Sequence, residues 1–457
     1  GILGRLDKEG RHMNTTANII RRYTLFGTIK LVSPLVIRAG IYGDILNDTV
    51  DDVVVTYSDG QAFIPGTSLA GVLRQILWRL EPSYVSLLFG NITDGNYQSA
   101  LQINDIPLED VNISVRDGIA IDDVRGVTMD GAKYDFEVID SGATGQLKIE
   151  CIIRACYEPQ VDDIENILIK LASLLKQGIS IGARTVNGLG KIVCEDIEVQ
   201  CYDFYSQKAV IAWLLKQPGE IVPIPGVSNL LHDDLIIDMN CYFNDTVLIK
   251  SIFSEARENL AMSLFIPGSS IKGVLRHHCR NIIAQMGLPQ SVDVKLFGDS
   301  KKHVSTKGHF FVDEVYLDYK NQQVEQTRIR VDKFTGGAMN HALFTDCPIR
   351  GTKNNKLSFP LHISITDCDD IEAGLMLLLV KDLMTGLITI GANKTIGYGT
   401  VEGETVKIRY KNNTYVINNE GKVITGNPSV LEGFVAAMYN SSNLIDCGNS
   451  ILASEEV

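Results

Sequence analysis

Apolar and polar residues alternate in two regions of the chain, 24–38 and 235–249, where β-branched and aromatic residues recur. This period of two predicts a strand in each region. Apolar residues recur at helical spacing after the first of these, at positions 69, 72, 73, 76, 77 and 80. Residues 162–175 and 370–383 have acidic front ends and apolar residues three to four apart, which is typical of amphipathic helices. The pattern therefore predicts strands interleaved with helices.

The same pattern occurs twice in the chain. Residues 63–74 read Phe-Ile-Pro-Gly-Thr-Ser-Leu-Ala-Gly-Val-Leu-Arg, and 265–276 read Phe-Ile-Pro-Gly-Ser-Ser-Ile-Lys-Gly-Val-Leu-Arg. Two further landmarks follow both in the same order, namely a Leu-Phe-Gly triplet (88–90 and 296–298) and a glycine-rich closing segment (178–190 and 386–399). Chance does not explain an ordered set of matches, so the chain contains two copies of one unit.

Two helices interleaved with strands in this order predict an α+β fold, with two tandem ferredoxin-like (RRM-like) β-α-β-β-α-β domains. In each copy a long polar insertion separates the helices, 91–145 and 299–355, and such insertions exceed simple connections. The predicted boundaries are a flexible start or cloning remnant at 1–17, a first domain at 18–202, a linker at 203–230, a second domain at 231–410 and a C-terminal tail at 411–457 with a short helix near 428–440.

Composition excludes several classes of protein. With 45% hydrophobic and 21% charged residues, the chain is neither disordered nor of low complexity overall. No apolar stretch reaches the roughly 20 residues of a membrane span, and the start lacks the apolar run of a secretion signal. Nine cysteines without a C-x-x-C pair argue against a disulfide framework and a zinc ribbon, so we expect a cytoplasmic protein.

The repeated Pro-Gly turn is a candidate anion site. Proline fixes one φ and glycine frees the next, so that backbone amides at the start of the following helix point outward. The groups expected to bind there are Gly66, Thr67, Ser68 and Arg74 in the first copy, and Gly268, Ser269, Ser270, Lys272 and Arg276 in the second. The alternative for one turn alone is a plain helix N-cap. Two copies with paired glycine loops favour the anion site.

The glycine-rich closing segments each carry one cation, Arg184 or Lys394, where glycine allows a ligand to approach the backbone. They lack the Walker A ending and the dinucleotide spacing, so nucleotide hydrolysis is not indicated. His277 and His278 follow the second turn, and RNA contact and simple packing both remain open for them. His309 and His341 are expected to be structural.

These motifs, together with an Arg-x-x-Val-Asp, Thr-Gly and Ala-Leu-Phe series in 328–344, resemble the RAMP superfamily of CRISPR systems. More narrowly, the chain is similar to the Cas-seven backbone subunits of type III effectors, here as a tandem fusion that is type III-D-like. The resemblance covers about residues 18–410.

The resemblance implies a function. Such subunits hold guide RNA (crRNA) along an RRM-like palm, and a β-hairpin thumb from each long insertion splays bases between guide and target. They cut target RNA at regular intervals, assisted by an aspartate and a divalent cation, which we expect to be Mg²⁺. The implied partners are crRNA, target RNA, neighbouring backbone subunits and other type III subunits including a large signalling subunit, with no membrane.

The resemblance places the cleavage site in the loop between the first strand and the first Pro-Gly turn. Asp51 is the expected catalytic and metal-binding residue, and Asp52 and Asp48 are its rivals; without the resemblance, this acidic cluster reads as solvated surface. The second copy departs from the pattern, so Asp245 is its candidate and a non-cutting second domain is the alternative. A carboxylate with a bound cation would steady the phosphate oxygens while the adjacent 2′-hydroxyl attacks.

Two other functions remain open, a non-catalytic subunit that holds crRNA and a metal-independent endoribonuclease that processes crRNA through a histidine. The formal net charge of −13, from 42 basic and 55 acidic side chains, opposes RNA binding by the surface as a whole. An RNA groove needs only a local basic stripe. Basic residues cluster around the motifs, including Arg38, Arg74, Arg184, Lys272, Arg276 and Lys394.

Overall fold

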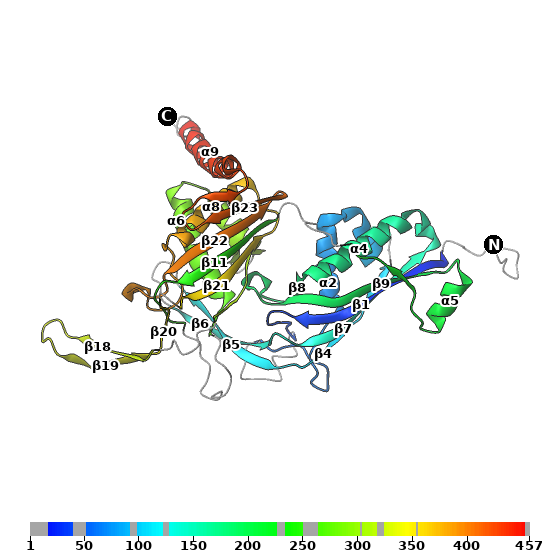
Figure 1. Ribbon diagram of the computed structural model, residues 1–457, viewed down its shortest axis with the longest axis horizontal. Coiled ribbons are helices and arrows are strands. Elements are labelled where there is room, and N and C mark those ends of the chain that lie inside the picture. Colours follow the sequence, from blue (N-terminus) through cyan, green and yellow to red (C-terminus); the bar gives the residue numbers. More distant parts are fainter. Residues whose placement is uncertain are drawn as a thin grey trace. The chain divides into compact units, whose positions relative to one another are not determined.

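The computed structural model describes residues 17–39, 52–91, 98–121, 128–225, 234–249, 264–301, 304–317, 324–352 and 355–452. The chain forms two compact units, one of residues 1–185 and 189–231 and one of residues 186–188 and 232–457. Each unit contains one copy of the repeat, except that residues 186–188 of the first closing segment belong to the second unit. The predicted α+β fold class is confirmed, since both units combine an antiparallel sheet with helices (Figure 1).

The first unit is built on a long antiparallel sheet with the strand order β10-β9-β1-β7-β4-β2, in which β3 also pairs with β7 and β8 with β9. The run β9-β1-β7-β4 has the strand order of a ferredoxin-like sheet. The strands are β1 Ile19–Leu31, β2 Phe63–Ile64, β3 Leu101–Ile103, β4 Ile106–Glu109, β7 Thr144–Arg154, β8 Ile179–Ser180, β9 Lys191–Asp203 and β10 Glu220–Val222.

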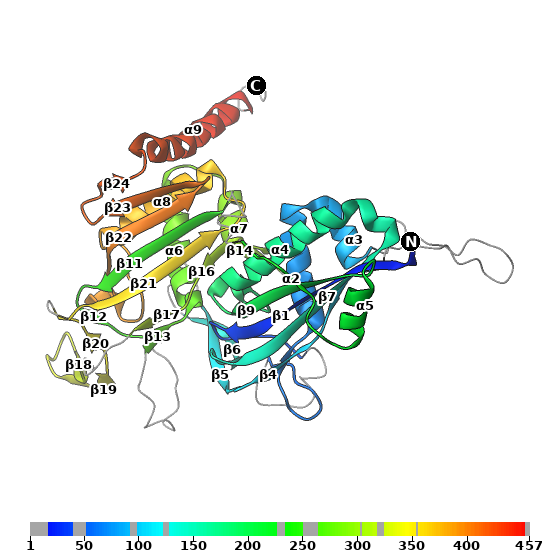
Figure 2. The same cartoon turned by 45° about the vertical axis from the view of Figure 1, so that its right-hand side comes forward.

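Helices α2 and α4 of the first unit cover one face of this sheet (Figure 2). Helix α2 (Gly66–Leu80) buries Leu69, Leu73 and Leu77, and this spacing of four places them on one face of the helix. Helix α4 (Val161–Gln177) likewise buries a stripe of aliphatic side chains and has acidic residues in its first turn. A short helix, α3 (Val85–Phe89), carries the Leu-Phe of the triplet.

The second unit repeats this plan with the order β16-β21-β11-β22-β23-β24. Its main helices are α6 (Gly268–Gln285) and α8 (Asp370–Met384), and α7 (Ser291–Phe297) corresponds to α3. The strands of the sheet are β11 Leu235–Phe243, β16 Phe310–Val312, β21 Leu357–Ile365, β22 Val401–Tyr410, β23 Asn413–Asn418 and β24 Val423–Thr425. Shorter pairs are β12 Thr246–Val247 with β20 Ile349–Arg350, β13 Leu264–Ile266 with β17 Val315–Leu317, and β14 Gly298–Lys301 with β15 Val304–Lys307.

Each long insertion contains a separate β-hairpin, as predicted. In the first unit β5 (Ile113–Ile121) pairs with β6 (Thr128–Ile139), and in the second β18 (Gln326–Val331) pairs with β19 (Ala338–Asp346). Figure 1 shows the β18–β19 hairpin as a ribbon that projects from its unit.

The predicted linker at 203–230 is largely part of the first unit. Helix α5 (Gln207–Leu214) follows β9, and β10 then pairs with β9 as the edge strand of the sheet. Trp213 of α5 lies against the Arg22 guanidinium, 4.4 Å from the ring centroid, and against Phe204. Aromatic packing and strand pairing therefore hold the predicted linker to the first unit.

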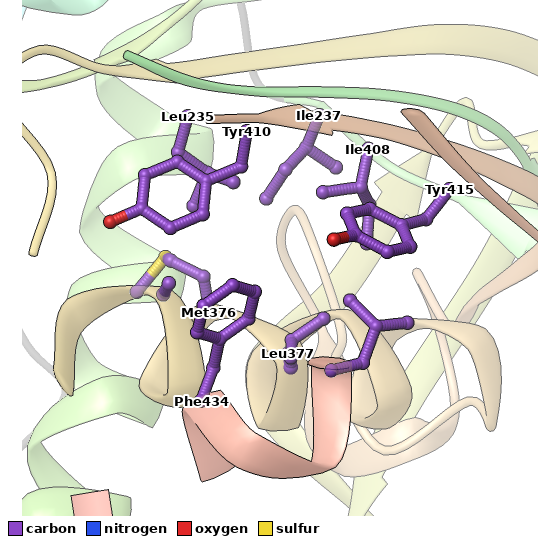
Figure 3. Close-up of a pocket in the computed structure, with 10 residues that line it drawn as sticks. Leu235, Ile237, Met376, Leu377, Ile408, Tyr410, Tyr415 and Phe434 are labelled. Carbon is purple, nitrogen blue, oxygen red and sulfur yellow. The ribbon is translucent and has the colours of Figure 1, made fainter. Parts of the chain in front are cut away.

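The predicted tail is integral to the second unit. Strands β23 and β24 extend its sheet, and helix α9 (Pro428–Leu452) confirms the expected helix but is longer. Tyr415 and Met438 are buried, and Figure 3 shows a small apolar pocket between the sheet, α8 and α9 that is bordered by Phe434. Within the described part of the chain, no helix is long and apolar enough to cross a membrane.

Helix α9 packs closely against α8 at Gly374. A Cβ atom at this position would lie 2.4 Å from the Phe434 carbonyl oxygen, whereas one at Gly433 on α9 would meet no atom within 4 Å. We predict that Gly374→Ala lowers the free energy of unfolding by about 2 kcal/mol because α9 must shift. Gly433→Ala should instead raise it by about 0.5 kcal/mol through helix propensity. Urea unfolding of both variants tests this; equal effects would contradict the packing.

Candidate nucleic-acid interface

The closing segment of the first copy is held by the backbone of its own unit. Gly190 N–H donates to the Pro34 carbonyl at 2.7 Å, and Ala183 N–H donates to the Val36 carbonyl at 2.8 Å. The segment is thereby fixed to the chain that leaves β1. Gly190 has a φ of +77°, and a Cβ there would lie 1.9 Å from the Ile181 carbonyl oxygen.

The second copy repeats the same bonds. Gly399 N–H donates to the Thr246 carbonyl at 2.7 Å, and Ala392 N–H donates to the Leu248 carbonyl at 2.8 Å. A Cβ at Gly399 would lie 1.9 Å from the Ile390 carbonyl oxygen. Glycine is therefore needed at Gly190 and Gly399 because the protein's own backbone approaches closely there, whereas the sequence suggested close approach of a ligand.

This fixed segment places Arg184 at the base of the first hairpin. Arg184 has a left-handed backbone with a φ of +59°, and its guanidinium lies 4.1 Å from the centroid of the Phe136 ring. The guanidinium also donates to the Tyr134 hydroxyl at 2.7 Å. Both aromatic residues belong to β6, so Arg184 joins the closing segment to the hairpin.

Asp52 joins the same cluster from the loop that precedes the first Pro-Gly turn. Its carboxylate lies 3.0 Å from the Arg38 guanidinium and 3.6 Å from that of Arg184. Its backbone pairs with β6, because Asp52 N–H donates to the Asp135 carbonyl and Glu137 N–H donates to the Asp52 carbonyl. The end of the predicted cleavage loop is thus attached to the hairpin.

The second copy makes the corresponding link with the two partners exchanged. Here the hairpin supplies the guanidinium, since Arg328 of β18 donates at 2.7 Å to the hydroxyl of Tyr398 in the closing segment. The acid is Asp346 of β19, which lies 3.3 Å from Arg328 and accepts a hydrogen bond from Asn393 at 3.1 Å. Asn393 has a φ of +60°, like Arg184. We call these two clusters the hairpin anchors: Arg184, Tyr134 and Asp52, and Arg328, Tyr398 and Asp346.

At the first Pro-Gly turn, the Gly66 amide does not point outward as predicted. The N-cap of α2 is Pro65, so Thr67 and Ser68 lie inside the first turn and no side chain caps the helix. Gly66 N–H donates to the Asp105 carboxylate at 2.7 Å, and a Cβ at Gly66 would lie 2.3 Å from the Ile103 carbonyl oxygen. This amide therefore binds an internal carboxylate, while the Thr67 side chain is exposed.

In the second turn Ser269 and Ser270 are exposed and Gly268 is buried behind the Pro267 N-cap. Lys272 is buried, and is not the exposed anion-binding cation that the sequence predicts. Only 8% of Lys272 is exposed, and its ammonium donates to the Phe310 carbonyl at 3.0 Å. Burial, with the nearby charges of Arg276 and Lys307, lowers the pKa of Lys272 to about 8.

Arg276 binds inside the second unit rather than facing outward. Its guanidinium makes two hydrogen bonds to the Asp293 carboxylate, at 3.0 and 2.8 Å, and a third to the Gly298 carbonyl at 2.7 Å. Arg280 also binds Asp293, at 3.0 Å. Burial alone would raise the pKa of Asp293, but the two guanidiniums outweigh it and hold that pKa below its ordinary value. This cluster ties α6 to α7 and to the Leu-Phe-Gly triplet.

Charge is unevenly distributed between the helices. Neither α2 nor α6 contains an Asp or Glu, whereas α4 and α8 contain several. Arg74 of α2 is exposed, as are His277 of α6 and Lys394 of the second closing segment. His278 is held by Asp382 at 2.8 Å and His309 by Glu372 at 2.8 Å, so both are packed in the second unit. The chain has a net negative charge, yet the first main helix of each copy, α2 or α6, contains no acidic residue.

The candidate catalytic residues are only partly described. Asp48 and Asp51 lie outside the described residues, whereas the Asp52 carboxylate is bound by two guanidiniums. Asp245 is exposed and pairs with Arg350 at 2.9 Å. Among the described residues, no group of three or more His, Cys, Asp and Glu side chains is placed to hold a metal ion.

The sequence matches the RAMP superfamily over residues 28–193 and 254–402, which together are more than half of the chain. The chain belongs to the RAMP superfamily. The two matched stretches coincide with the two copies, so the protein contains tandem RAMP domains. No curated protein matches the chain. RAMP proteins act in CRISPR RNA–protein complexes, which fits two domains that each carry a β-hairpin in the long insertion.

The buried ammonium of Lys272 generates a pH-dependent prediction. A lysine whose folded pKa is lowered to about 8 binds fewer protons in the folded state, so stability rises between about pH 8 and the ordinary value near 10.5. Lys272→Met should remove this rise and stabilise the second RAMP domain by about 1 kcal/mol at pH 7. Urea unfolding at pH 7, 8 and 10 measures both effects. Weaker RNA binding by this variant would show instead that Lys272 contacts phosphate.

The hairpin anchors generate a second prediction. Tyr134→Phe removes the hydroxyl that accepts from Arg184 but keeps the ring, and Tyr398→Phe does the same for Arg328. We expect each change to lower the free energy of unfolding by about 1 to 2 kcal/mol and to speed amide hydrogen exchange in its own hairpin. Tyr316→Phe, which removes an exposed hydroxyl, is the control. Unchanged exchange in the β5–β6 hairpin of Tyr134→Phe would argue against the anchor.

Proposed function

We propose that this chain is a guide-RNA-binding backbone subunit of a type III CRISPR ribonucleoprotein, which also cuts complementary target RNA. The observation that carries the proposal is the pair of hairpin anchors. Each RAMP domain ties its hairpin to its closing segment with an arginine, a tyrosine and an aspartate. A hairpin held at its base can press between stacked bases without folding back onto its own domain.

The tip of the second hairpin supports a wedge function. The Phe334 side chain is 99% exposed, and the turn that carries it is held by the Asp332 carboxylate, which accepts hydrogen bonds from the amides of Phe334 and Thr335 at 2.8 and 2.9 Å. These backbone hydrogen bonds lower the pKa of Asp332. An aromatic ring on a fixed turn can stack on a base, and the flanking Arg330 and Lys333 suit a phosphate backbone.

We assign target cleavage to the first RAMP domain, with Asp51 as the catalytic residue and the ligand of a divalent cation, Mg²⁺. Support comes from its neighbour. Asp52 is bound by Arg38 and Arg184 and paired with β6, which leaves it poorly suited to hold a metal but well placed to fix the loop beside the hairpin. Asp52 is therefore a positioning residue in this proposal, and splaying by the hairpin would let the 2′-hydroxyl attack in line.

The second RAMP domain is proposed to hold guide RNA without cutting. Its anchor takes its acid from the hairpin itself, at Asp346, so the anchor does not include the loop that follows β11. Asp245 is paired with Arg350 on the surface, where such pairs contribute little. The proposed partners are crRNA, target RNA, neighbouring backbone subunits and a large signalling subunit, in the cytoplasm.

Three substitutions test the assignment in the assembled complex with guide RNA. Asp51→Ala should abolish metal-dependent cutting of target RNA and keep guide affinity. Asp52→Asn should slow cutting by at least about tenfold through misplacement of the loop, again with guide affinity kept. Asp245→Asn is the matched control and should cut normally. Gel analysis of labelled target RNA, with and without EDTA, measures each rate.

The outcomes separate the open alternatives. Normal cutting by Asp51→Ala would reject the assignment. No cutting by the unmodified chain, with guide RNA still bound, would leave a purely structural subunit. Cutting of guide precursor that persists in EDTA and is lost in His277→Ala would indicate a metal-independent processing enzyme; this needs an oriented partner for His277, since His278 is already bound to Asp382.

A further inference from the structure

Helix α2 presents an exposed indole beside an exposed guanidinium. Trp78 is 64% exposed, and Arg74 lies one turn earlier on the same face of the helix. A Cβ at Gly71, a further turn back, would meet no atom within 4 Å, so this face is open. The other tryptophan, Trp213, is covered by Arg22 and Phe204. The indole of Trp78 and the guanidinium of Arg74 therefore face solvent together on α2.

The second RAMP domain uses the same two helical positions differently. Arg276 stands where the first copy has Arg74, and Arg280 stands where it has Trp78; both bind the buried Asp293. The first copy has Val85 at the position of Asp293, and Val85 is 1% exposed in the apolar core. Among the described residues, no carboxylate is paired with Arg74. The first copy therefore lacks the internal acid, and its Arg74 side chain is exposed.

The charges around this face favour a polyanion. Helix α2 contains no acidic residue, although the chain has a formal charge of −13. The helix therefore differs in charge from the surface as a whole. Glu81, just beyond its end, is paired with Lys170 at 2.9 Å. A phosphate at Arg74 would thus meet little repulsion from α2 itself.

We propose that Trp78 and Arg74 form a binding subsite for single-stranded RNA, in which the indole stacks on one base and the guanidinium binds a neighbouring phosphate. One helical turn, about 5 Å, separates the two side chains, which suits a base and a phosphate of adjacent nucleotides. Aromatic stacking with arginine contacts is a general mode of single-strand binding that tolerates any base. The inference rests on the proposed RNA-binding function and adds a contact that the second copy cannot make.

Tryptophan fluorescence tests this directly, because the chain has two tryptophans. Trp213→Phe keeps a ring beside Arg22 and leaves Trp78 as the only indole; Trp78→Phe leaves only Trp213 as the matched control. Each full-length chain is titrated with a fluorescein-labelled oligouridine, whose anisotropy reports binding independently. We expect quenching in the Trp78-only chain and none in the Trp213-only chain. Trp78→Ala should weaken binding about tenfold, and Arg74→Met should reduce the salt slope by about one.

The outcomes distinguish this subsite from the proposed function. If oligouridine binds by anisotropy but Trp78 emission is unchanged and Trp78→Ala binds equally well, the subsite is wrong and the RNA-binding function stands. If no chain binds oligouridine or guide RNA, both fail. If Trp78 emission shifts with protein concentration in the absence of RNA, the face is a protein contact and the RNA assignment is overturned. Circular dichroism confirms that the variants are folded.

Discussion

The constraint on which both RAMP domains depend is the attachment of the closing segment to the strand exit of its own sheet. In each copy a glycine N–H and an alanine N–H bind carbonyls of the chain that follows the first strand, at nearly the same distances. Only glycine fits at Gly190 and Gly399, because any Cβ would collide with a backbone oxygen. This attachment fixes the left-handed residue that follows the alanine, which is Arg184 in the first copy and Asn393 in the second. Through that residue it positions the hairpin anchor. The glycine pattern is therefore a requirement of the fold before it is one of binding.

From this shared frame the two copies have diverged. The anchor of the first copy draws its aspartate from the loop before the Pro-Gly turn, whereas that of the second draws it from the hairpin. Arg276 of α6 binds Asp293 inside its unit, whereas Arg74 of α2 faces solvent beside Trp78. One chain thus presents two related but unequal surfaces, which is consistent with a division between a cutting and a holding domain.

Much of the fold could be predicted from the sequence, because the two copies have the same residue types at turns and helix starts. The hairpin anchors could not be predicted, because the arginine and the tyrosine exchange places between the copies. The hairpin carries Tyr134 in the first copy and Arg328 in the second, and the closing segment carries Arg184 and Tyr398, so only tertiary contact relates them. The cation expected in register with Arg184 was Lys394, yet Asn393 shares its backbone conformation. Burial of Lys272 depends on Phe310 from a distant strand. The Asn and Ser content of residues 411–457 favours a tail, although Leu431, Phe434 and Met438 at helical spacing are a signal of packing.

We propose that both RAMP domains of this chain hold RNA through anchored hairpins and through first helices that contain no acidic residue. Photo-crosslinking of the assembled complex, with guide RNA that carries photoreactive uridines and with peptides identified by mass spectrometry, tests it most directly. We expect crosslinked peptides from both copies, including the β18–β19 tip with Phe334 and the outer face of α2. Crosslinks confined to one copy, or found only on α4 and α8, would contradict it.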